Sequence, residues 1–395
     1  MAPPGLTRRV HRELHAALGF LVLWQLAVLA GVPRAVAVPL GLLGFVLHVV
    51  FAKAYTLVPS YFERELAVPW APTVQLPLTA AGALGLAAAA GGLAPDGLGA
   101  VAALAWFAGV LVFAGAMGWT LRGNLLGAAT GTGEPNADRR AVDRFANAFV
   151  PIAGAYLLIG AYELAGSWTA LPTLLGGYPP RSSHLLAAGG VTLLLFAVGF
   201  RLLPRFLVAR PPRLLVGIVL PAGAIGPALL AAYLPAGPVF VVGAALEATA
   251  VVGFAAAYAW LFHRSDRRRI GFYPVGAGLL AGVAAVGLGL HMATAGFDLE
   301  LARAHARLNL LGFLGLTIVG VTYQFYPPAA GRFRGASDRV GLAVVGLLGV
   351  GLLVEVGGLL AGVEVLTVAG RALAFVGAVG YAVLLAGLLR RLRNR

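Results

Sequence analysis

Twelve runs of apolar residues divide this chain, and each is long enough to form a membrane-spanning helix, which needs about 20 apolar residues. Turn-forming segments such as Pro95-Asp96-Gly97 separate the runs. The pattern predicts spans near 16–31, 36–58, 74–93, 98–121, 146–166, 184–203, 214–233, 238–262, 274–293, 304–326, 339–361 and 365–390. We therefore expect an all-α, polytopic protein with twelve transmembrane helices, surrounded by a lipid bilayer.

The basic residues between these runs predict the orientation of the chain. Of the 29 Lys and Arg residues, Lys53 and Arg371 fall within predicted spans. Four lie on one side of the membrane, and the remaining 23 lie on the side of both termini. The four exceptions are Arg34, Arg181, Arg303 and Arg307. Because cytoplasmic loops are enriched in Lys and Arg, we expect a multi-pass protein of the cell membrane with both termini in the cytoplasm.

Three predicted spans end in the same phrase, in which a glycine is followed eleven positions later by an aromatic residue and then by a proline. The three phrases are Gly44…Tyr55…Pro59, Gly189…Phe200…Pro204 and Gly312…Tyr323…Pro327. The repeat is far too long for a solenoid unit. It indicates three pseudo-repeated four-helix groups, approximately 1–121, 122–262 and 263–395, in which spans two, six and ten are equivalent and related by an approximate three-fold rotation.

Composition supports the membrane class and excludes several others. Hydrophobic residues make up 60% of the chain and charged residues 11%, against about 25% charged in soluble domains. The net charge of +14 follows from the loop arginines, so nucleic acid is not an expected partner. The chain has no cysteine, which excludes disulfides and thiolate sites. Residues 1–15 lead directly into the first span, so we expect no cleavable signal peptide.

Span ten carries the most specific motif, which begins with Ala304-His305-Ala306-Arg307 and continues to Gly312. Here the chain resembles subunit I of the haem-copper oxidases and nitric-oxide reductases. In that family the tenth of twelve helices carries a His-x-His pair followed by a glycine, an aromatic-rich exit and a proline. The first histidine binds the high-spin haem and the second the low-spin haem. His305 occupies the first position and Arg307 the second.

The resemblance covers the architecture of most of the chain, since the family also has three groups of four helices, but other ligands depart from it. The family's helix two carries the second low-spin haem ligand near its outer end, whereas span two has His48 about mid-membrane. Copper in the family needs histidines on helices six and seven. Span six begins at His184, and span seven has none between Leu214 and Tyr233. The resemblance implies a divergent member, similar to relatives linked to haem, copper or nitric-oxide stress, that keeps one haem or metal site; copper is not expected.

Three histidines are predicted near the outer ends of their spans: His184, His291 and His305. Imidazole is a common axial ligand of haem iron, and the resembled family holds its haems at this depth. All three are therefore candidate haem ligands, and His305 and His184 are also candidate metal ligands that we expect to approach one cavity. The alternative is that they are interfacial polar residues at helix ends, with Ser182 or Ser183 capping span six.

Arg303 and Arg307 lie on the outer side against the charge bias, four residues apart on one helical face. A guanidinium fork matches a carboxylate, so Arg307 is a candidate partner for haem propionates. The alternative, which we favour, is that Asp298 and Glu300 in the preceding loop neutralise both arginines.

Glu355, Arg371, Glu247 and Lys53 fall well inside predicted spans, where ionisable residues are costly and usually functional. Glu355 and Arg371 are expected to form a buried structural pair. Glu247 has no charge nearby in the sequence; we expect it to face the bundle interior and to carry protons or contact a quinone. Lys53 lies near the cytoplasmic end of span two, and its alternative role is to extend its ammonium group to that interface.

These residues leave three functions open. The first is a haem- or metal-binding membrane protein with a redox or gas-related (O2 or NO) role. Such a protein could be an oxidoreductase of electron transport, with respiratory-chain subunits as its partners. The second is a cofactor-free transporter, which the 55 glycines suit, although transporters usually show two-fold repeats. The third is a cofactor-free subunit that anchors a respiratory complex. A haem absorbance band in the purified protein would separate the first from the other two.

Overall fold

The computed structural model describes residues 4–393, with side chains for residues 5–390, and these residues form helices and connecting segments without a β-strand. Twelve helical segments of the described chain are long and apolar enough to cross a membrane, which confirms the predicted all-α polytopic fold. The basic residues that predict the orientation include Arg395, which lies outside the described residues.

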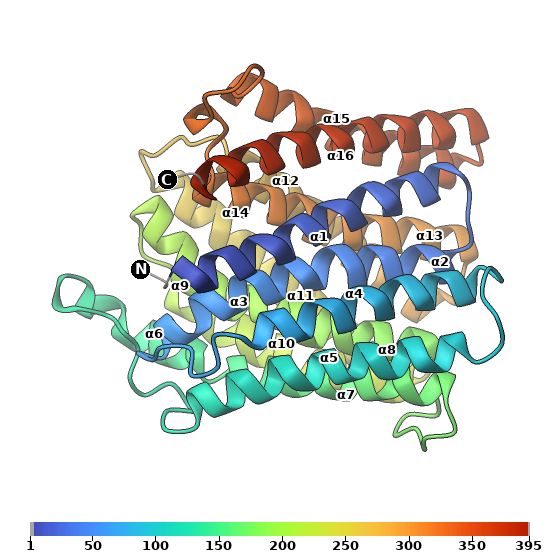
Figure 1. Ribbon diagram of the computed structural model, residues 1–395, viewed down its shortest axis with the longest axis horizontal. Helices are drawn as coiled ribbons and strands as arrows, with labels where there is room; N and C mark the ends of the chain where they lie inside the picture. The colour runs from blue at the N-terminus through green and yellow to red at the C-terminus, as the bar shows by residue number, and fades with distance from the viewer. Residues whose placement is uncertain (1–3, 394–395) are drawn as a thin grey trace. The chain divides into compact units, whose positions relative to one another are not determined.

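Most spans are single α-helices, and the others are assembled from shorter helices (Figure 1). The single helices are α1 (Pro4–Leu29), α4 (Ala71–Ala90), α5 (Leu98–Leu121), α10 (Arg213–Tyr233), α11 (Pro238–His263), α12 (Phe272–Ala295), α15 (Asp338–Ala361) and α16 (Glu364–Arg393). The assembled spans contain α2 (Arg34–Val38), η1 (Pro39–Val46) and α3 (Leu47–Tyr61); η2 (Glu134–Arg139), α6 (Arg140–Asn147) and α7 (Val150–Trp168); α8 (Pro179–His184), η3 (Leu185–Thr192) and α9 (Leu193–Leu207); and α13 (Leu299–Arg307), η4 (Leu308–Leu316), α14 (Thr317–Phe325) and η5 (Pro328–Ala330).

The first helix differs most from its predicted bounds, because α1 begins at Pro4 rather than near residue 16. Its added part is amphipathic: Leu6, Val10 and Leu14 recur every four residues and are 4%, 3% and 1% exposed. This spacing places them on one helical face. A search for continuous apolar runs misses such a segment because charged residues alternate with the buried ones.

The chain forms two compact units. The first comprises Met1–Leu14 and Leu47–Asp266, and the second comprises His15–Val46 and Arg267–Arg395. Within the first unit, α4 packs along α5 and α10 packs along α11; within the second, α15 packs along α16 (Figure 1). Each of these pairs consists of helices that follow one another in the sequence.

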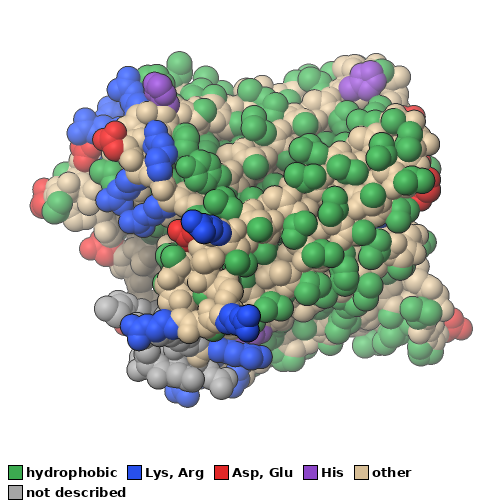
Figure 2. Space-filling model, turned by 90° about the horizontal axis from the view of Figure 1, so that it is seen from above, with side chains coloured by type: hydrophobic (Ala, Val, Ile, Leu, Met, Phe, Trp, Pro, Cys, Tyr) green, Lys and Arg blue, Asp and Glu red, His purple; other side chains and the backbone are tan. Residues whose placement is uncertain are grey.

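Large apolar side chains remain exposed in the middle of several spans. Leu280 is 71% exposed, Leu353 67% and Val376 53%. Figure 2 shows hydrophobic side chains over the flanks of the helices, with Lys and Arg side chains mainly near the helix ends. Soluble monomers rarely expose contiguous apolar surface of this kind, so these flanks suit contact with lipid and the protein is a multi-pass membrane protein.

Spans two, six and ten share a π-helical segment that no other described span contains. The three segments, η1, η3 and η4, lie at corresponding places in their spans. A π-helix is rare and usually limited to a single turn within an α-helix. The repeat glycines Gly44, Gly189 and Gly312 all lie inside these segments, which gives the sequence repeat a structural counterpart.

Each repeat glycine packs against the helix that precedes its span. A Cβ atom built on any of the three would come within 3.0 Å of a side chain on that helix, so a larger residue would force the helices apart. The contacts are Gly44 on Phe20 of α1, Gly189 on Tyr156 of α7, and Gly312 on Ala281 of α12. The first two helices of each group therefore meet at the same residue of the phrase.

The aromatic residue of each phrase packs against an aromatic ring on the fourth helix of its group. The ring centroids lie 5.2, 5.1 and 6.0 Å apart for Tyr55–Phe113, Phe200–Phe254 and Tyr323–Tyr381, respectively. Such pairs stabilise helix packing beyond their buried area.

The third and fourth helices of each group meet at a glycine that contacts backbone. A Cβ atom on this glycine would lie within about 3 Å of a backbone amide nitrogen on the fourth helix. The pairs are Gly82 with Trp106, Gly226 with Glu247, and Gly351 with Ala374. Each of these fourth-helix residues stands seven positions before the aromatic partner described above. The contacts thus recur residue by residue, as three repeated four-helix groups require.

Candidate functional site

A cavity of about 690 Å³ lies in the second unit, among α1, α2, α13, α15 and α16. It adjoins the α1–α2 connection and the α15–α16 turn, at the end that the charge bias predicts to face outside. We call it the outer cavity. Its lining residues are Trp24, Val28, Gly31, Val32, Pro33, Arg34, Ala37, Val38, Glu300, Arg303, Ala306, Arg307, Leu310, Glu355, Gly358, Leu359, Gly362, Glu364, Thr367 and Arg371.

The outer cavity combines apolar walls with charged side chains. Its apolar residues come from α1, α2, η4 and α15. Its charged residues are four arginines and three glutamates: Arg34, Arg303, Arg307, Arg371, Glu300, Glu355 and Glu364. Cavities of this size, apolar with a few placed polar groups, are where proteins hold small organic ligands.

Arg307 is the most buried arginine of the cavity, with 8% of its surface exposed. It ends α13, a helix that Asp298 caps by accepting a hydrogen bond from the amide of Leu301 at 2.8 Å. Its Nε atom donates to Oε2 of Glu355 at 2.8 Å, and its Nη2 atom lies 2.7 Å from the same oxygen. Its guanidinium also lies 5.1 Å from the ring centroid of Trp24. The side chain is therefore fixed from two sides, by a carboxylate and by an aromatic face.

Glu355 joins two arginines. Its side chain is 1% exposed, and its Oε1 atom lies 3.3 Å from Nε of Arg371. This is the buried pair with Arg371 that we inferred from the sequence, and the structure adds Arg307 to it. A buried carboxylate is tolerated when ion pairs and hydrogen bonds offset its loss of hydration.

We expected Asp298 and Glu300 to neutralise both Arg303 and Arg307. This expectation is confirmed for Arg303 and wrong for Arg307. Arg303 pairs with Glu300 at 2.5 Å, and both side chains are about half exposed. Arg307, one turn further into the helix, pairs instead with Glu355 on α15. Asp298 caps α13 and Glu300 lies in its first turn, whereas Arg307 is the last residue of that helix, so neither carboxylate serves as its partner.

The outer cavity contains Arg307, which the sequence marked as a candidate partner for haem propionates. It is lined by Arg34 and Ala37 at the outer end of span two and by Arg307 at the second position of the span-ten pair. The lining residues include no histidine, methionine, cysteine or tyrosine. This donor set does not fit a haem whose iron is coordinated from the cavity walls. In the described part of the chain, no group of three or more His, Cys, Asp or Glu side chains is placed to hold a metal ion.

His305 faces away from the outer cavity, because two residues turn an α-helix by about 200°. Its Nδ1 atom lies 2.8 Å from the carbonyl oxygen of Ala285 on α12, and its Nε2 atom lies 3.1 Å from Nδ2 of Asn309. The carbonyl can only accept, so Nδ1 carries the proton and Nε2 offers a lone pair. A Cβ on Gly289 would lie 3.0 Å from the imidazole ring. Histidine ligands of metals commonly have this Nδ1 arrangement.

The other outer histidines differ in their surroundings. His184 belongs to the first unit, and its Nδ1 atom lies 2.7 Å from the carbonyl oxygen of Pro180. His291 is exposed near the end of α12. His305 belongs to the second unit, so the cavity that we expect it to share with His184 stays a prediction.

The first unit buries several carboxyl groups in its helices, among them those of Glu247 and Glu13. Glu247 is 8% exposed, and its Oε2 atom has no hydrogen-bond partner among the described residues. Glu13 is 0% exposed, and neither of its carboxyl oxygens has such a partner. Glu13 escaped the sequence analysis because the predicted first span began after it; the periodicity of Leu6, Val10 and Leu14 would have found it. Lys53 is half-buried in α3.

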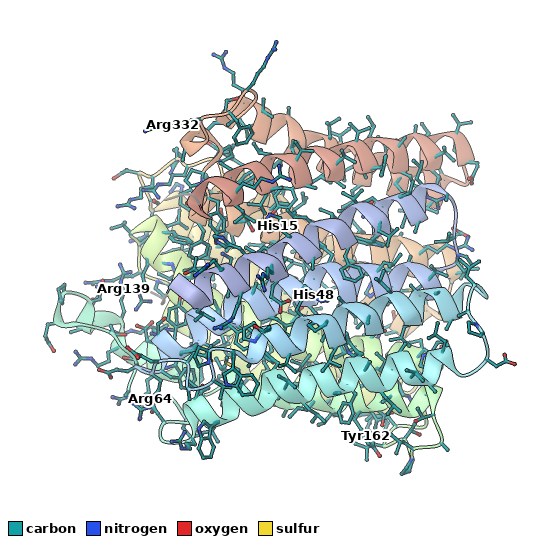
Figure 3. All side chains as sticks on the ribbon, in the orientation of Figure 1. His15, His48, Arg64, Arg139, Tyr162 and Arg332 are labelled. Atoms are coloured by element: carbon teal, nitrogen blue, oxygen red, sulfur yellow. The ribbon has the colours of Figure 1, made fainter. Side chains whose placement is uncertain are left out.

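His48 lies at the start of α3, near the middle of the helical span 34–61 (Figure 3). It is 0% exposed, and its Nε2 atom lies 3.1 Å from the hydroxyl oxygen of Thr79 on α4. The rings of Phe51 and Trp106 lie 6.2 and 6.3 Å from the imidazole. These contacts describe a satisfied core histidine between three helices.

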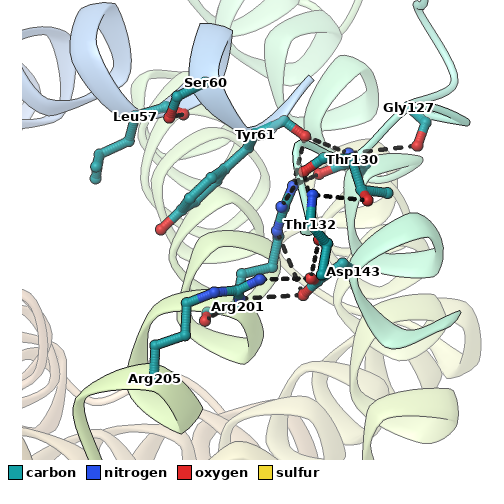
Figure 4. A network of polar contacts seen from close by, with 10 residues as sticks. Leu57, Ser60, Tyr61, Gly127, Thr130, Thr132, Asp143, Arg201 and Arg205 are labelled. Carbon is teal, nitrogen blue, oxygen red and sulfur yellow. Dashed lines mark hydrogen bonds and ion pairs between the residues drawn. The ribbon is translucent and has the colours of Figure 1, made fainter. Parts of the chain in front are cut away.

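A second polar network ties the segment 122–145 to the rest of the first unit (Figure 4). Asp143, 1% exposed, pairs with Arg201 at 3.4 Å and with Arg205 at 2.5 Å. Arg201 also donates to the carbonyl oxygens of Tyr61 and Thr130 at 2.6 Å each. The predicted spans leave residues 122–145 between helices, whereas the structure contains η2 and the start of α6 there. Because these contacts satisfy backbone groups, the network has a structural role.

Comparison with known proteins assigns no family: no protein-family model matches the chain, and no curated protein matches it. The architecture of the described residues identifies the chain as an all-α, multi-pass membrane protein with twelve candidate spans.

Proposed function

We propose that the protein binds a small organic ligand in the outer cavity and acts as a cofactor-free carrier for it. The observation that carries the proposal is the cavity of about 690 Å³ itself, which places three buried or half-buried charged groups, Arg307, Glu355 and Arg371, beside apolar walls. Ionisable residues within spans are costly and usually mark ligand or ion pathways.

The cavity also favours the carrier over an anchoring subunit. A subunit that only anchors a complex does not need charged groups around a cavity. Apolar residues would fill that cavity with a smaller desolvation penalty. The glycine contacts that repeat in all three groups would let helices shift against each other, as transport requires.

Native mass spectrometry of protein purified from its own membrane tests the proposal. We expect the wild-type protein to retain a small molecule that an Ala306→Trp variant loses, because the indole would fill the cavity that Ala306 lines. Ala304→Trp would destabilise the fold and would not report on ligand binding, because Ala304 is 0% exposed. The control is Leu299→Trp, at an exposed position of the same helix. Equal retention by wild type and Ala306→Trp would overturn the proposal.

Haem binding is the second candidate, with the redox or gas-related role and the respiratory-chain partners that the resemblance implies. Its support is the hydrogen bond from Nδ1 of His305 to Ala285, which leaves Nε2 as an acceptor; to hold an iron, Nε2 would exchange its hydrogen bond with Asn309 for the metal. A haem held by His305 would supply a redox-active or gas-binding iron. Purified protein with a haem absorbance band that shifts in His305→Ala would support this candidate, and a colourless protein would reject it.

A further inference from the structure

A small pocket in the first unit lies where η2, α6, α9 and the start of α10 meet. Its volume is about 60 Å³. One buried water needs roughly 10–15 Å³ of such space, so the pocket holds a few waters or one ion of the size of phosphate. We call it the arginine pocket, because its charged lining residues are Arg139, Arg205, Arg210, Arg213, Asp138 and Asp143.

The arginine pocket has more positive than negative charge. Both of its aspartates already have arginine partners. The pairs are Asp143–Arg205 at 2.5 Å (Figure 4) and Asp138–Arg210 at 2.8 Å. The guanidinium groups of Arg139 and Arg213 form no hydrogen bond or ion pair with the described residues. The lining, with four arginines and two aspartates, therefore carries an excess of two positive charges.

The two unpaired arginines are accessible and come from different elements. Arg139 is the last residue of η2 and is half-buried, and Arg213 is the first residue of α10 and is exposed. A ligand in the pocket therefore reaches both side chains. A guanidinium group binds phosphate oxygens through paired N–H donors, so two such groups that line one pocket can hold one phosphate together.

The start of α10 adds positive potential at the same place. Pro212 precedes the helix without a side-chain cap, and the first turn contains no acidic residue. The amide N–H groups at a helix start attract anions and repel cations. Arg213 is therefore repelled by the dipole of its own helix, and a bound anion would offset that repulsion.

We propose that the arginine pocket binds the phosphate group of a phosphate monoester. Such a group carries a charge of about −1.5 to −2 at pH 7 and three strong acceptor oxygens. This charge matches the two unpaired arginines of the pocket. The outer cavity lies in the second unit, so phosphate binding and the proposed carrier function stand or fall separately.

The surroundings of the pocket favour a membrane phospholipid as the source of the phosphate. The charge bias predicts that α10 begins at the cytoplasmic side, where basic pockets between transmembrane helices bind anionic lipid headgroups. Leu214 and Ile218 are 75% and 39% exposed and lie on one face of α10. They offer apolar surface for acyl chains next to Arg213. A soluble phosphate monoester would present the same group without acyl chains.

A matched set of three probes tests the proposal. Dioleoyl phosphatidate carries a phosphate monoester, dioleoylglycerol is the same lipid without it, and glycerol 3-phosphate is the same headgroup without acyl chains. Native mass spectrometry of the full chain in detergent measures their binding. We expect the wild type to bind phosphatidate roughly tenfold more tightly than either other probe, because charge-assisted bonds to phosphate are strong. The double variant Arg139→Gln/Arg213→Gln, the pocket variant, should lose the preference for phosphatidate over dioleoylglycerol.

The control for the pocket variant removes the same amount of charge elsewhere in the first unit. It is Arg122→Gln/Arg264→Gln, at two exposed arginines that stack on Trp119 and Trp260, and it should keep the preference. A thermal unfolding scan checks that both double variants fold. Arg213→Gln alone, at an exposed position, should fold like the wild type and weaken phosphatidate binding severalfold.

Each outcome decides the proposal or the source of the phosphate. If phosphatidate binds most tightly and only the pocket variant loses it, the ligand is a phospholipid. If glycerol 3-phosphate binds the wild type as tightly as phosphatidate and the pocket variant loses both, the pocket binds a soluble phosphate monoester. The proposal is wrong if neither phosphate probe binds, if the folded pocket variant binds phosphatidate as the wild type does, or if the control loses as much binding.

Discussion

The buried carboxylates of this protein differ in how many ion-pair partners they have. Glu355 pairs with two arginines, whereas Glu247 forms no ion pair with the described residues and has one carboxyl oxygen without a hydrogen-bond partner among them. We expect Glu355→Gln to lower the free energy of unfolding by roughly 3–5 kcal/mol, because it leaves Arg307 and Arg371 without their carboxylate. Glu247→Gln should change it by less than about 1 kcal/mol, because no charged partner is lost. Unfolding midpoints in mixed detergent measure both. Equal losses would mean that Glu247 has a partner of its own.

A second prediction concerns the network around Asp143. Asp143→Ala should cost roughly 3–5 kcal/mol, because Arg201 is buried and would lose its carboxylate. The control is Arg210→Ala, which removes an ion pair with Asp138 whose arginine side chain is 79% exposed; exposed pairs contribute about 0–1 kcal/mol. If the two variants unfold at the same denaturant concentration, the network does not hold the 122–145 segment.

At the scale of the residue, the sequence located the charged groups and two of their pairs, Glu355–Arg371 and Glu300–Arg303, but not the partner of Arg307. Ion pairs such as Arg307–Glu355 join residues 48 positions apart, and no local spacing reports which helices meet. Local periodicity does report pairs such as Glu300–Arg303. The burial of Glu13 was missed because a polar residue in an amphipathic segment looks like a boundary in an apolar scan.

At the scale of the element, glycine positions decide how closely helices approach. Gly351 of α15 faces the backbone of α16, and a Cβ there would lie 2.5 Å from the amide nitrogen of Ala374. Gly349, two residues earlier, has nothing within 4 Å of such an atom. We expect Gly351→Ala to destabilise the protein by about 1–3 kcal/mol through overpacking. Gly349→Ala should be neutral or stabilising by up to about 1 kcal/mol, since alanine favours helix.

The same unfolding assay compares these variants. Similar effects of Gly349→Ala and Gly351→Ala would contradict the close approach of α15 and α16.

The sequence predicted the positions of the helices well, because membrane spans need long apolar runs. It did not predict the π-helical segments, because their hydrogen bonding depends on packing against neighbouring helices and no residue type specifies it.

At the scale of the whole molecule, the orientation in the membrane is open to direct measurement. The chain has no cysteine, so single cysteines can be added without background. We expect a membrane-impermeant maleimide to label Asp96→Cys in intact cells, and to label Glu134→Cys only after the cells are opened. Both positions are exposed. Labelling of Glu134→Cys from outside would reverse the orientation and place the outer cavity on the cytoplasmic side.

The three glycine-lined pairs of helices have a consequence for biosynthesis. In each pair, α4–α5, α10–α11 and α15–α16, the two helices follow one another in the chain and are joined by a short turn. Contacts between neighbours in sequence form faster than contacts between distant segments. Each pair can therefore close as soon as its second helix leaves the ribosome and enters the bilayer. The nascent chain would then be assembled from three preformed hairpins, and each π-helix-containing span would pack afterwards against the hairpin that follows it in the chain.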